Sequence, residues 1–223
     1  MKHRESEQTQ LRVSRLLNRD SVMLHAEMPS VQTALETLVE LQESNGVITN
    51  GTAYYKAVCE RERAGGTTAI GEGLAIPHAC NAGVASLGLA ALTHTRGLDW
   101  GAADGKLVDM IFMVAVPPDR QSDHLLILAR LVNLLSDHRL TEKLRMADTR
   151  EAFIRILNQT EAAVDSAAEE AVLSAADAAE LAAVLPQAAR ETARQPAVKI
   201  ESAFFMVSSS QIYASLTGIH YAA

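Results

Sequence analysis

Two histidines stand where an imidazole ring could do chemistry. His78 directly follows Pro77, at the end of the short apolar run Leu74-Ala75-Ile76, and His124 lies further along the chain in the run Asp123-His124-Leu125. The ordinary imidazole pKa of about 6.5 leaves a ring nitrogen free at pH 7. A histidine of this kind can accept a phosphoryl group through a labile P–N bond and pass it on. We therefore take His78 as a candidate phosphoryl acceptor.

The loop before His78 has the residue types that contact phosphate oxygens. Thr67 and Thr68 offer hydroxyl donors, and Gly71 and Gly73 allow a close approach of backbone amides. The following proline cannot donate a backbone hydrogen bond and restricts the residue before it to extended geometry. We expect a strand to end at this proline and to place His78 at the strand terminus, with the loop supporting the phosphate.

His124 falls at the expected start of a helix, for which Ser122 or Asp123 is the candidate N-cap. Free amide donors and partial positive charge concentrate in the first turn of a helix, which suits a neighbouring phosphate. The same field disfavours the imidazolium form. His124 is therefore predicted to act as a neutral donor that supports a phosphoryl group without carrying it.

Apolar periodicity predicts the elements that must position these residues. Ser30 caps a helical pattern that closes near Gly46, and a second helix is expected from about Thr52 to Arg61. Strands are expected over 74–76, 87–92 and 107–116, and further helices from 122 or 123, over 140–146 and over 149–157. This alternation predicts an α/β fold: a layered domain with a mixed central sheet flanked by helices, plus a helical C-terminal extension.

Composition divides the chain into four parts. Residues 1–10 are expected to be a flexible lead and residues 11–158 the working domain. Residues 159–197, rich in alanine and glutamate and interrupted by Pro186 and Pro196, are expected to form a linker or exposed helices. Residues 198–223 are too short to bury a core, so we expect no independent domain there, and residues 160–223 are predicted to be dispensable for chemistry at His78.

Charge and cysteine content exclude several classes of function. The 223 residues carry a net charge of −7 without a basic cluster, which argues against a nucleic-acid partner or an anionic membrane surface. Cys59 and Cys80 are the two cysteines, too few for a disulfide framework. The N-terminus lacks the apolar core of a signal peptide, and no apolar stretch is long enough to enter a bilayer. A cytoplasmic location without membrane insertion is expected.

The run from Thr67 to Cys80, together with His124, resembles the enzyme IIA domain of the phosphoenolpyruvate-dependent sugar phosphotransferase system, of the fructose/mannitol type. The resemblance covers roughly residues 11–157. It implies that His78 carries the phosphoryl group and that His124 helps to hold it. The family also places an arginine at the end of the preceding helix. Arg61 and Arg63 are the candidates here, although neither lies at the spacing from the motif that the family shows. We prefer Arg61; the alternative is that both arginines are ordinary surface charges.

The resemblance also implies partners. Phosphorylated HPr would donate to His78, which would pass the group to a cysteine of an enzyme IIB component serving a IIC sugar permease. The sugar expected from the family is fructose, and neither a metal nor an organic cofactor is implied. The alternative is a regulatory, nitrogen-related enzyme IIA that binds target proteins according to its phosphorylation state. The alanine-rich extension, similar to the linkers of fused permeases, favours the sugar-transport hypothesis.

Other interpretations of the same residues are open. His78 could be an ordinary turn histidine satisfied by a backbone hydrogen bond, or could pair with Cys80 as a nucleophile dyad. His78, Cys80, His94 and His124 could together bind zinc, although their spacing matches no compact ligand pattern. We prefer phosphoryl transfer and expect Cys80 to be a small packing residue.

Overall fold

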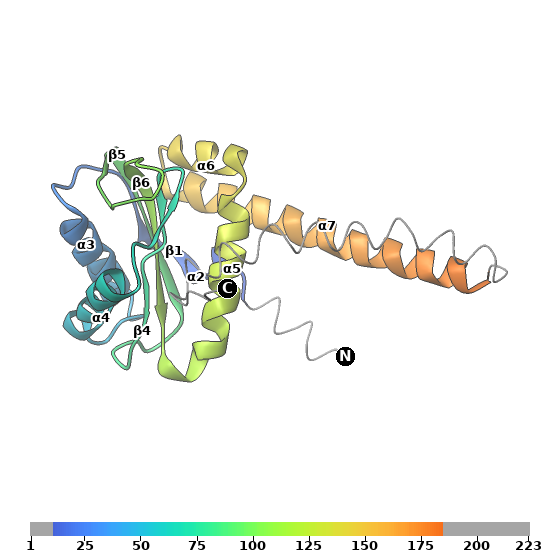
Figure 1. Cartoon of the computed structure of the whole chain (residues 1–223), viewed down its shortest axis with the longest axis horizontal. Coiled ribbons are helices and arrows are strands. Elements are labelled where there is room, and N and C mark those ends of the chain that lie inside the picture. The colour runs from blue at the N-terminus through green and yellow to red at the C-terminus, as the bar shows by residue number, and fades with distance from the viewer. Residues whose placement is uncertain (1–10, 185–223) are drawn as a thin grey trace, which may run out of the picture. The chain divides into compact units, whose positions relative to one another are not determined.

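The computed structural model of the protein describes residues 11–184 (Figure 1). Its strands are β1 (Leu17–Ala26), β2 (Ala69–Gly71), β3 (Leu74–Ala75), β4 (His78–Cys80), β5 (Gly88–Leu98) and β6 (Val108–Val116). They form a six-stranded sheet in the order β1-β5-β6-β3-β2, with β4 also paired to β6. Because β5 runs antiparallel to β6 while β3 and β4 run parallel to it, the sheet is mixed, as predicted.

Helices cover both faces of this sheet. In Figure 1, α3 (Val31–Ser44) and α4 (Gly51–Ala64) lie on one face. The other face carries α5 (Gln121–Leu135), α6 (His138–Arg145) and the opening turns of α7 (Arg150–Val184). A short helix, α2 (Val13–Leu16), precedes β1. The predicted α/β layered fold is confirmed.

The apolar pattern of the sequence explains the central layers. β6 is almost continuously apolar, and its residues from Met110 to Val116 are fully buried because both of its faces are covered. Ser30 caps α3 by accepting a hydrogen bond from the Thr33 amide, as expected. On the opposite face, the rings of Phe112 in β6 and Phe153 in α7 lie 6.0 Å apart. The two helical layers are thereby packed onto one central strand.

Pro77 separates β3 from β4, two short strands that pair one after the other with β6. Both strands pair parallel with β6: Leu74 lies opposite Met110, and His78 lies opposite Val114. Pro77 has no amide hydrogen, but its carbonyl accepts a hydrogen bond from the Val114 amide at 3.0 Å. The strand ends at the proline, as predicted, and pairing with β6 resumes at His78.

Strand β1 was not predicted from the sequence. It pairs parallel with β5 at the edge of the sheet, and two register shifts interrupt the pairing. Its burial follows no strict alternation, since Leu17 and Val22 are buried while the residues between them, apart from Ser21, are exposed. Period-two patterning, which is the signal of a strand, is therefore weak in this segment.

Helix α5 begins earlier than expected. A 3-10 turn, Pro118–Arg120, runs directly into Gln121, and the N-cap position is occupied by Arg120 without a side-chain cap. The prediction that Ser122 or Asp123 caps the helix was wrong. Both residues lie inside the first turn, where the Asp123 carboxylate pairs with Arg120 instead.

Helix α7 holds the N-terminal end of the domain through Glu161. The Glu161 carboxylate is buried, accepts hydrogen bonds from the backbone amides of Val13 and Ser14 at 2.8 and 2.9 Å, and pairs with Arg130 of α5 at 2.6 Å. Burial alone would raise the pKa of Glu161, but hydrogen bonds from Ser14, Arg130 and Val13 outweigh burial and lower it. The chain beyond 160 therefore contributes at least one structural residue to the domain.

By its internal contacts the chain divides into two units after Glu161. The first unit thus extends three residues beyond 158. In the second unit, the described residues 162–184 are helical and continue α7, which agrees with the expected helical extension. The expectations for residues 1–10, 185–197 and 198–223 lie outside the described residues.

Candidate active site

His78 lies at the start of β4 with its imidazole ring almost completely buried, at 3 % exposure. Its Nδ1 lies 2.8 Å from the carbonyl oxygen of Ile76. A carbonyl can only accept a hydrogen bond, so Nδ1 carries the proton and Nε2 keeps its lone pair. The backbone hydrogen bond expected of an ordinary turn histidine is thus present, and it also selects the tautomer with Nε2 as the nucleophile.

The surroundings of His78 keep its ring neutral. Burial is the main cause that lowers the pKa of His78 to about 4, and the charges of His124 and Arg61 act in the same direction. The hydrogen bond to Ile76 opposes them. A neutral imidazole at pH 7 is the form that can attack phosphorus.

His124 faces His78 from the first turn of α5. The two ring centroids lie 4.9 Å apart, with the ring planes tilted by 58°. Burial, followed by the charge of Arg61, lowers the pKa of His124 as well. Its Nε2 is buried and has no hydrogen-bond partner among the residues that the structure describes. A buried polar atom of this kind costs about 1–3 kcal/mol if it is left unsatisfied, so a ligand oxygen at this position would be stabilised.

Arg61 lies in the last turn of α4, and its positive charge lowers the pKa of both histidines. Its guanidinium folds back over the end of the helix, where a Cβ atom on Gly65 would come within 2.0 Å of Nη1. Gly65 is therefore needed for this placement of the arginine. The contact of Gly65 with Arg61 depends on the path of the arginine side chain, which residue type and spacing do not reveal.

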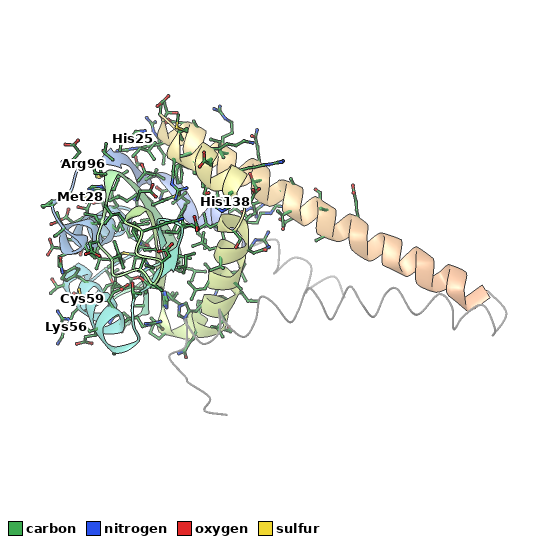
Figure 2. The ribbon with its side chains drawn as sticks, turned by 45° about the horizontal axis from the view of Figure 1, so that its top comes forward. His25, Met28, Lys56, Cys59, Arg96 and His138 are labelled. Carbon is green, nitrogen blue, oxygen red and sulfur yellow. The ribbon has the colours of Figure 1, made fainter. Side chains whose placement is uncertain are left out.

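Arg63 points to a different part of the molecule. It lines a cavity of about 640 Å³ between α3, α4 and residues 99–101, together with Lys56 and Cys59, which Figure 2 labels on the outer side of α4. Of the two arginines considered from the sequence, Arg61 is the one whose charge affects the histidine pair. The alternative that both are merely surface charges fits Arg63.

The hydroxyl groups of Thr67 and Thr68 are engaged within the protein. Thr67 donates to the carbonyl of Trp100 at 2.9 Å, and Thr68 donates to the carboxylate of Glu62, which also accepts from the Thr68 amide at 3.1 Å. The structure therefore uses both threonines to fix the loop after α4. It does not direct their hydroxyls toward His78, contrary to the expectation of phosphate donors.

Gly71 and Gly73 form the tight turn between β2 and β3, with φ values of 93° and 78°. The carbonyl of Gly73 accepts from the amides of Asp109 and Met110, whereas His78 pairs with Val114. This register separates the turn from the histidine by four residues of β6, or about 13 Å at the usual rise per residue. The expectation that these glycines approach the phosphate is corrected: they shape a hairpin at the other end of the strand.

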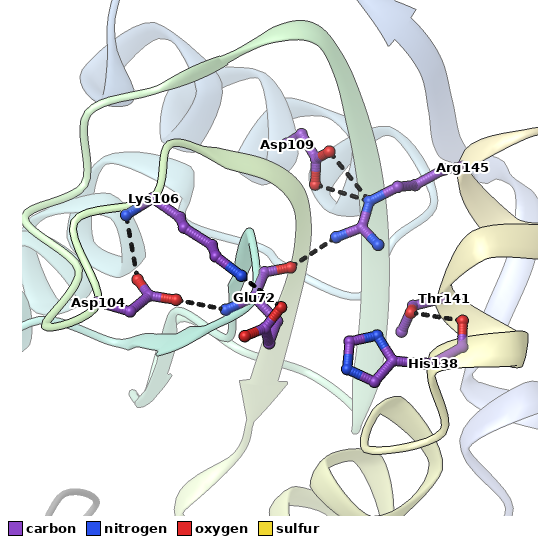
Figure 3. Close-up of polar contacts among 7 residues, drawn as sticks. All are labelled: Glu72, Asp104, Lys106, Asp109, His138, Thr141 and Arg145. Atoms are coloured by element: carbon purple, nitrogen blue, oxygen red, sulfur yellow. Dashed lines mark hydrogen bonds and ion pairs between the residues drawn. The ribbon is translucent and has the colours of Figure 1, made fainter.

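That end of the sheet carries a cluster of paired charges (Figure 3). The Arg145 guanidinium pairs with Asp109 at 2.9 Å and donates to the Glu72 carbonyl at 2.6 Å. Lys106 pairs with the Glu72 carboxylate at 2.6 Å, while Asp104 accepts from the Glu72 amide at 2.8 Å. Glu72 itself has a φ of 53°, and these contacts hold its backbone in that strained conformation.

The alternative sites considered from the sequence receive little support. Cys80 is exposed, so the expectation of a packing residue was wrong. The His94 ring lies against the backbone of Met28 and Arg96 at 3.0–3.1 Å. Within residues 11–184, no group of three or more histidine, cysteine or acidic side chains is arranged to bind a metal ion.

Two exposed leucines border the histidine pair. Leu125 and Leu126, which directly follow His124, are 51 % and 58 % exposed, whereas Leu128 and Leu131 of the same helix are buried. The apolar pattern of the helix would place all four on one buried face, but the structure exposes the first two. Their exposure beside His124 forms an apolar rim of the kind expected where another protein docks.

The family comparison agrees with this geometry. Residues 15–160 match the family model of the phosphoenolpyruvate-dependent sugar phosphotransferase system, EIIA 2. The chain belongs to this family. Its members are phosphotransferase components, which supports a role in phosphoryl transfer.

Both sugar-transport components and nitrogen regulatory proteins are similar to this enzyme IIA chain. It is 30 % identical over 149 residues to the "PTS system fructose-specific EIIABC component" of Bacillus subtilis, covering 67 % of this chain but 23 % of that protein. It is 34 % identical over 143 residues to the "Nitrogen regulatory protein" of Bradyrhizobium diazoefficiens, covering 62 % of this chain and 92 % of the relative. The solved structure of IIA-Ntr from Neisseria meningitidis superposes with a TM-score of 0.61 at 28 % identity, covering 65 % of this chain and 98 % of that one.

The matched part therefore corresponds to about a quarter of the fused Bacillus relative and to nearly the whole of the regulatory one. Among residues 11–184, no helix has the length and apolar character needed to cross a membrane.

Proposed function

We propose that this chain is a phosphohistidine carrier in which Nε2 of His78 accepts a phosphoryl group from phosphorylated HPr. The observation that carries the proposal is the facing histidine pair. His78 is neutral with a free Nε2, its ring centroid lies 4.9 Å from that of His124, and the buried Nε2 of His124 has no hydrogen-bond partner within residues 11–184. The pair offers a nucleophile and, beside it, a donor for phosphoryl oxygens.

The transfer balances without a cofactor. The P–N bond to the donor histidine breaks while a bond forms between phosphorus and Nε2 of His78, and the proton on Nδ1 stays in its hydrogen bond to Ile76. In the onward step the thiolate of an acceptor cysteine attacks phosphorus, a P–S bond forms, and the electron pair of the broken P–N bond returns to Nε2 of His78. His124 as a neutral donor and the positive charge of Arg61 stabilise the charge on the phosphoryl oxygens.

The acceptor that we propose is an enzyme IIB component serving a IIC permease for a fructose-type sugar, with this chain acting in the cytoplasm. The similarity to the fructose-specific EIIABC component supports this assignment. The exposed Leu125 and Leu126 beside His124 suit a partner that must bring its reactive group to His78 and then leave.

A regulatory role is the second candidate. It is favoured by one observation: this chain covers 92 % of a nitrogen regulatory protein and 98 % of the solved IIA-Ntr chain. In that case the same phosphorylation of His78 would control binding to a target protein.

Incubation of the full-length chain with phosphoenolpyruvate, enzyme I and HPr tests the shared step. We expect one acid-labile, base-stable phosphoryl group, located on His78 by mass spectrometry under neutral conditions. Absence of modification, or modification mainly on His124, would overturn the assignment. Addition of a fructose-type enzyme IIB then separates the two roles, since loss of the label from His78 to a IIB cysteine is expected only of a sugar-transport component.

A further inference from the structure

We infer that Tyr54 is a positioning residue for phosphoryl transfer, because its hydroxyl fixes the strand pair that presents His78. This inference rests on the proposed function of His78. Tyr54 belongs to α4, which contacts β4, and its side chain is fully buried.

The Tyr54 hydroxyl reaches the backbone at the residue opposite the phosphoryl acceptor. It donates a hydrogen bond of 2.7 Å to the carbonyl oxygen of Val114, and Val114 is the register partner of His78. The backbone amide of Ala79, the residue after His78, interacts with the same hydroxyl. One buried group therefore contacts both strands at the pair that carries the reactive ring.

The break at Pro77 makes this contact important. β4 is three residues long and joins the sheet through β6, where the Val114 amide donates to the Pro77 carbonyl. Val114 is thus held through its amide by the chain just before His78 and through its carbonyl by Tyr54. Burial raises the pKa of the Tyr54 phenol far above its ordinary value, so the hydroxyl stays protonated and remains a donor.

The position of this strand pair sets the direction of the attacking nitrogen. The His78 ring is oriented by its own hydrogen bond to Ile76, which lies on the other side of the proline break. A shift of β4 relative to β6 would move the ring with respect to that carbonyl and to His124. Small misplacements of reacting groups reduce rates steeply, by up to about 100-fold for 1 Å.

The test compares Tyr54→Phe with Tyr55→Phe. Each variant removes one hydroxyl from neighbouring residues of the same helix, but Tyr55 lines the outer cavity between α3 and α4. Single-turnover transfer from HPr phosphorylated by phosphoenolpyruvate and enzyme I is measured over a range of donor concentrations. For Tyr54→Phe we expect the maximal rate to fall about tenfold. The half-saturating donor concentration should not change, because the apolar rim at Leu125 and Leu126 is intact.

A spectroscopic readout separates positioning from general stability. Nitrogen-15 NMR of labelled histidine should show His78 with its proton on Nδ1 in the wild-type chain and in Tyr55→Phe. In Tyr54→Phe the second tautomer should become populated, because the hydrogen bond to Ile76 is no longer held in place.

Three results would overturn the inference: an unchanged maximal rate and unchanged histidine spectrum in Tyr54→Phe, an equal loss in both variants, or a Tyr54→Phe chain that does not fold. The last would mean that the hydroxyl supports the whole domain and not the local position of His78. If the wild-type chain accepts no phosphate, the proposed function fails, while the NMR comparison still tests whether Tyr54 orients the ring.

Discussion

Strands β3 and β4 pair one after the other with β6, and the polar groups at the two ends of this segment differ in burial and in hydrogen bonding. At the β2–β3 turn, Glu72, Asp109 and Arg145 pair with neighbouring charges or backbone groups, at or near the surface. At the other end, His78 and His124 are at least partly buried, and Nε2 of His124 has no partner in the described part of the chain. Paired charges hold a hairpin in place, whereas a buried ring nitrogen without a hydrogen-bond partner among the described residues, beside a neutral histidine, is suited to bind a ligand.

Replacement of His78 gives the strongest test of this contrast. His78→Gln removes the nucleophile while keeping a polar side chain, so phosphorylation by HPr should fall by more than about 1,000-fold, with the fold retained. Phosphorylation is measured by mass spectrometry and folding by circular dichroism. A variant that accepts phosphate at the wild-type rate would show that the buried pair is not the reactive site.

Glu161 extends the comparison, because its carboxylate is paired like the charges at the β2–β3 turn but buried like the histidines. Glu161→Ala removes the buried carboxylate that pairs with Arg130 and accepts hydrogen bonds from the amides of Val13 and Ser14, so the free energy of unfolding should fall by about 3 kcal/mol or more. Chemical denaturation measures the change.

The same argument revises the prediction that residues 160–223 are dispensable: a chain ending at 160 should be unstable, whereas one ending at 168 should fold and accept phosphate.

Acid should lower the free energy of unfolding of the chain through His78. The pKa of His78 is about 4 in the folded chain against an ordinary 6.5, so between these values the unfolded state binds a proton that the folded state does not. Stability should therefore decline as pH falls from 6.5 to 4, by about 3 kcal/mol from this residue. Denaturation curves of the wild type and His78→Gln isolate the effect, and equal slopes against pH would contradict it.

Removal of the unpartnered donor should slow transfer without unfolding the chain. His124→Ala should reduce the rate of phosphorylation of His78 by about 100-fold, the scale of losing one well-placed electrostatic donor. The thermal midpoint should change little, because the packing lost with the ring is offset by removal of a buried Nε2 that has no hydrogen-bond partner within residues 11–184. Unchanged transfer kinetics would make His124 a bystander.

The smallest effect is expected at the paired end. Arg145→Gln removes the partner of Asp109 from the surface cluster, so it should cost about 1 kcal/mol or less in the free energy of unfolding. Transfer to His78 should be unchanged, because the turn lies about 13 Å away along β6. A large loss of transfer in this variant would show that the two ends of the strand are coupled.

Much of the site was predictable because its signals are local. The order Ile76-Pro77-His78 fixes a strand end and places a histidine directly after it, whatever surrounds it. The apolar runs of β6 and the Ser30 cap of α3 likewise depend on a few neighbouring residues, and both were confirmed.

Other features depend on residues far apart in the chain, and the tertiary structure alone decided them. Gly71 and Gly73 are near His78 in sequence, yet pairing with β6 separates them from it in space. Leu125 and Leu126 fit an apolar pattern but lie at a helix end that no layer covers. The contact of Tyr54 with Val114 and the anchoring of Glu161 follow from packing between separate elements, which residue type and spacing do not encode.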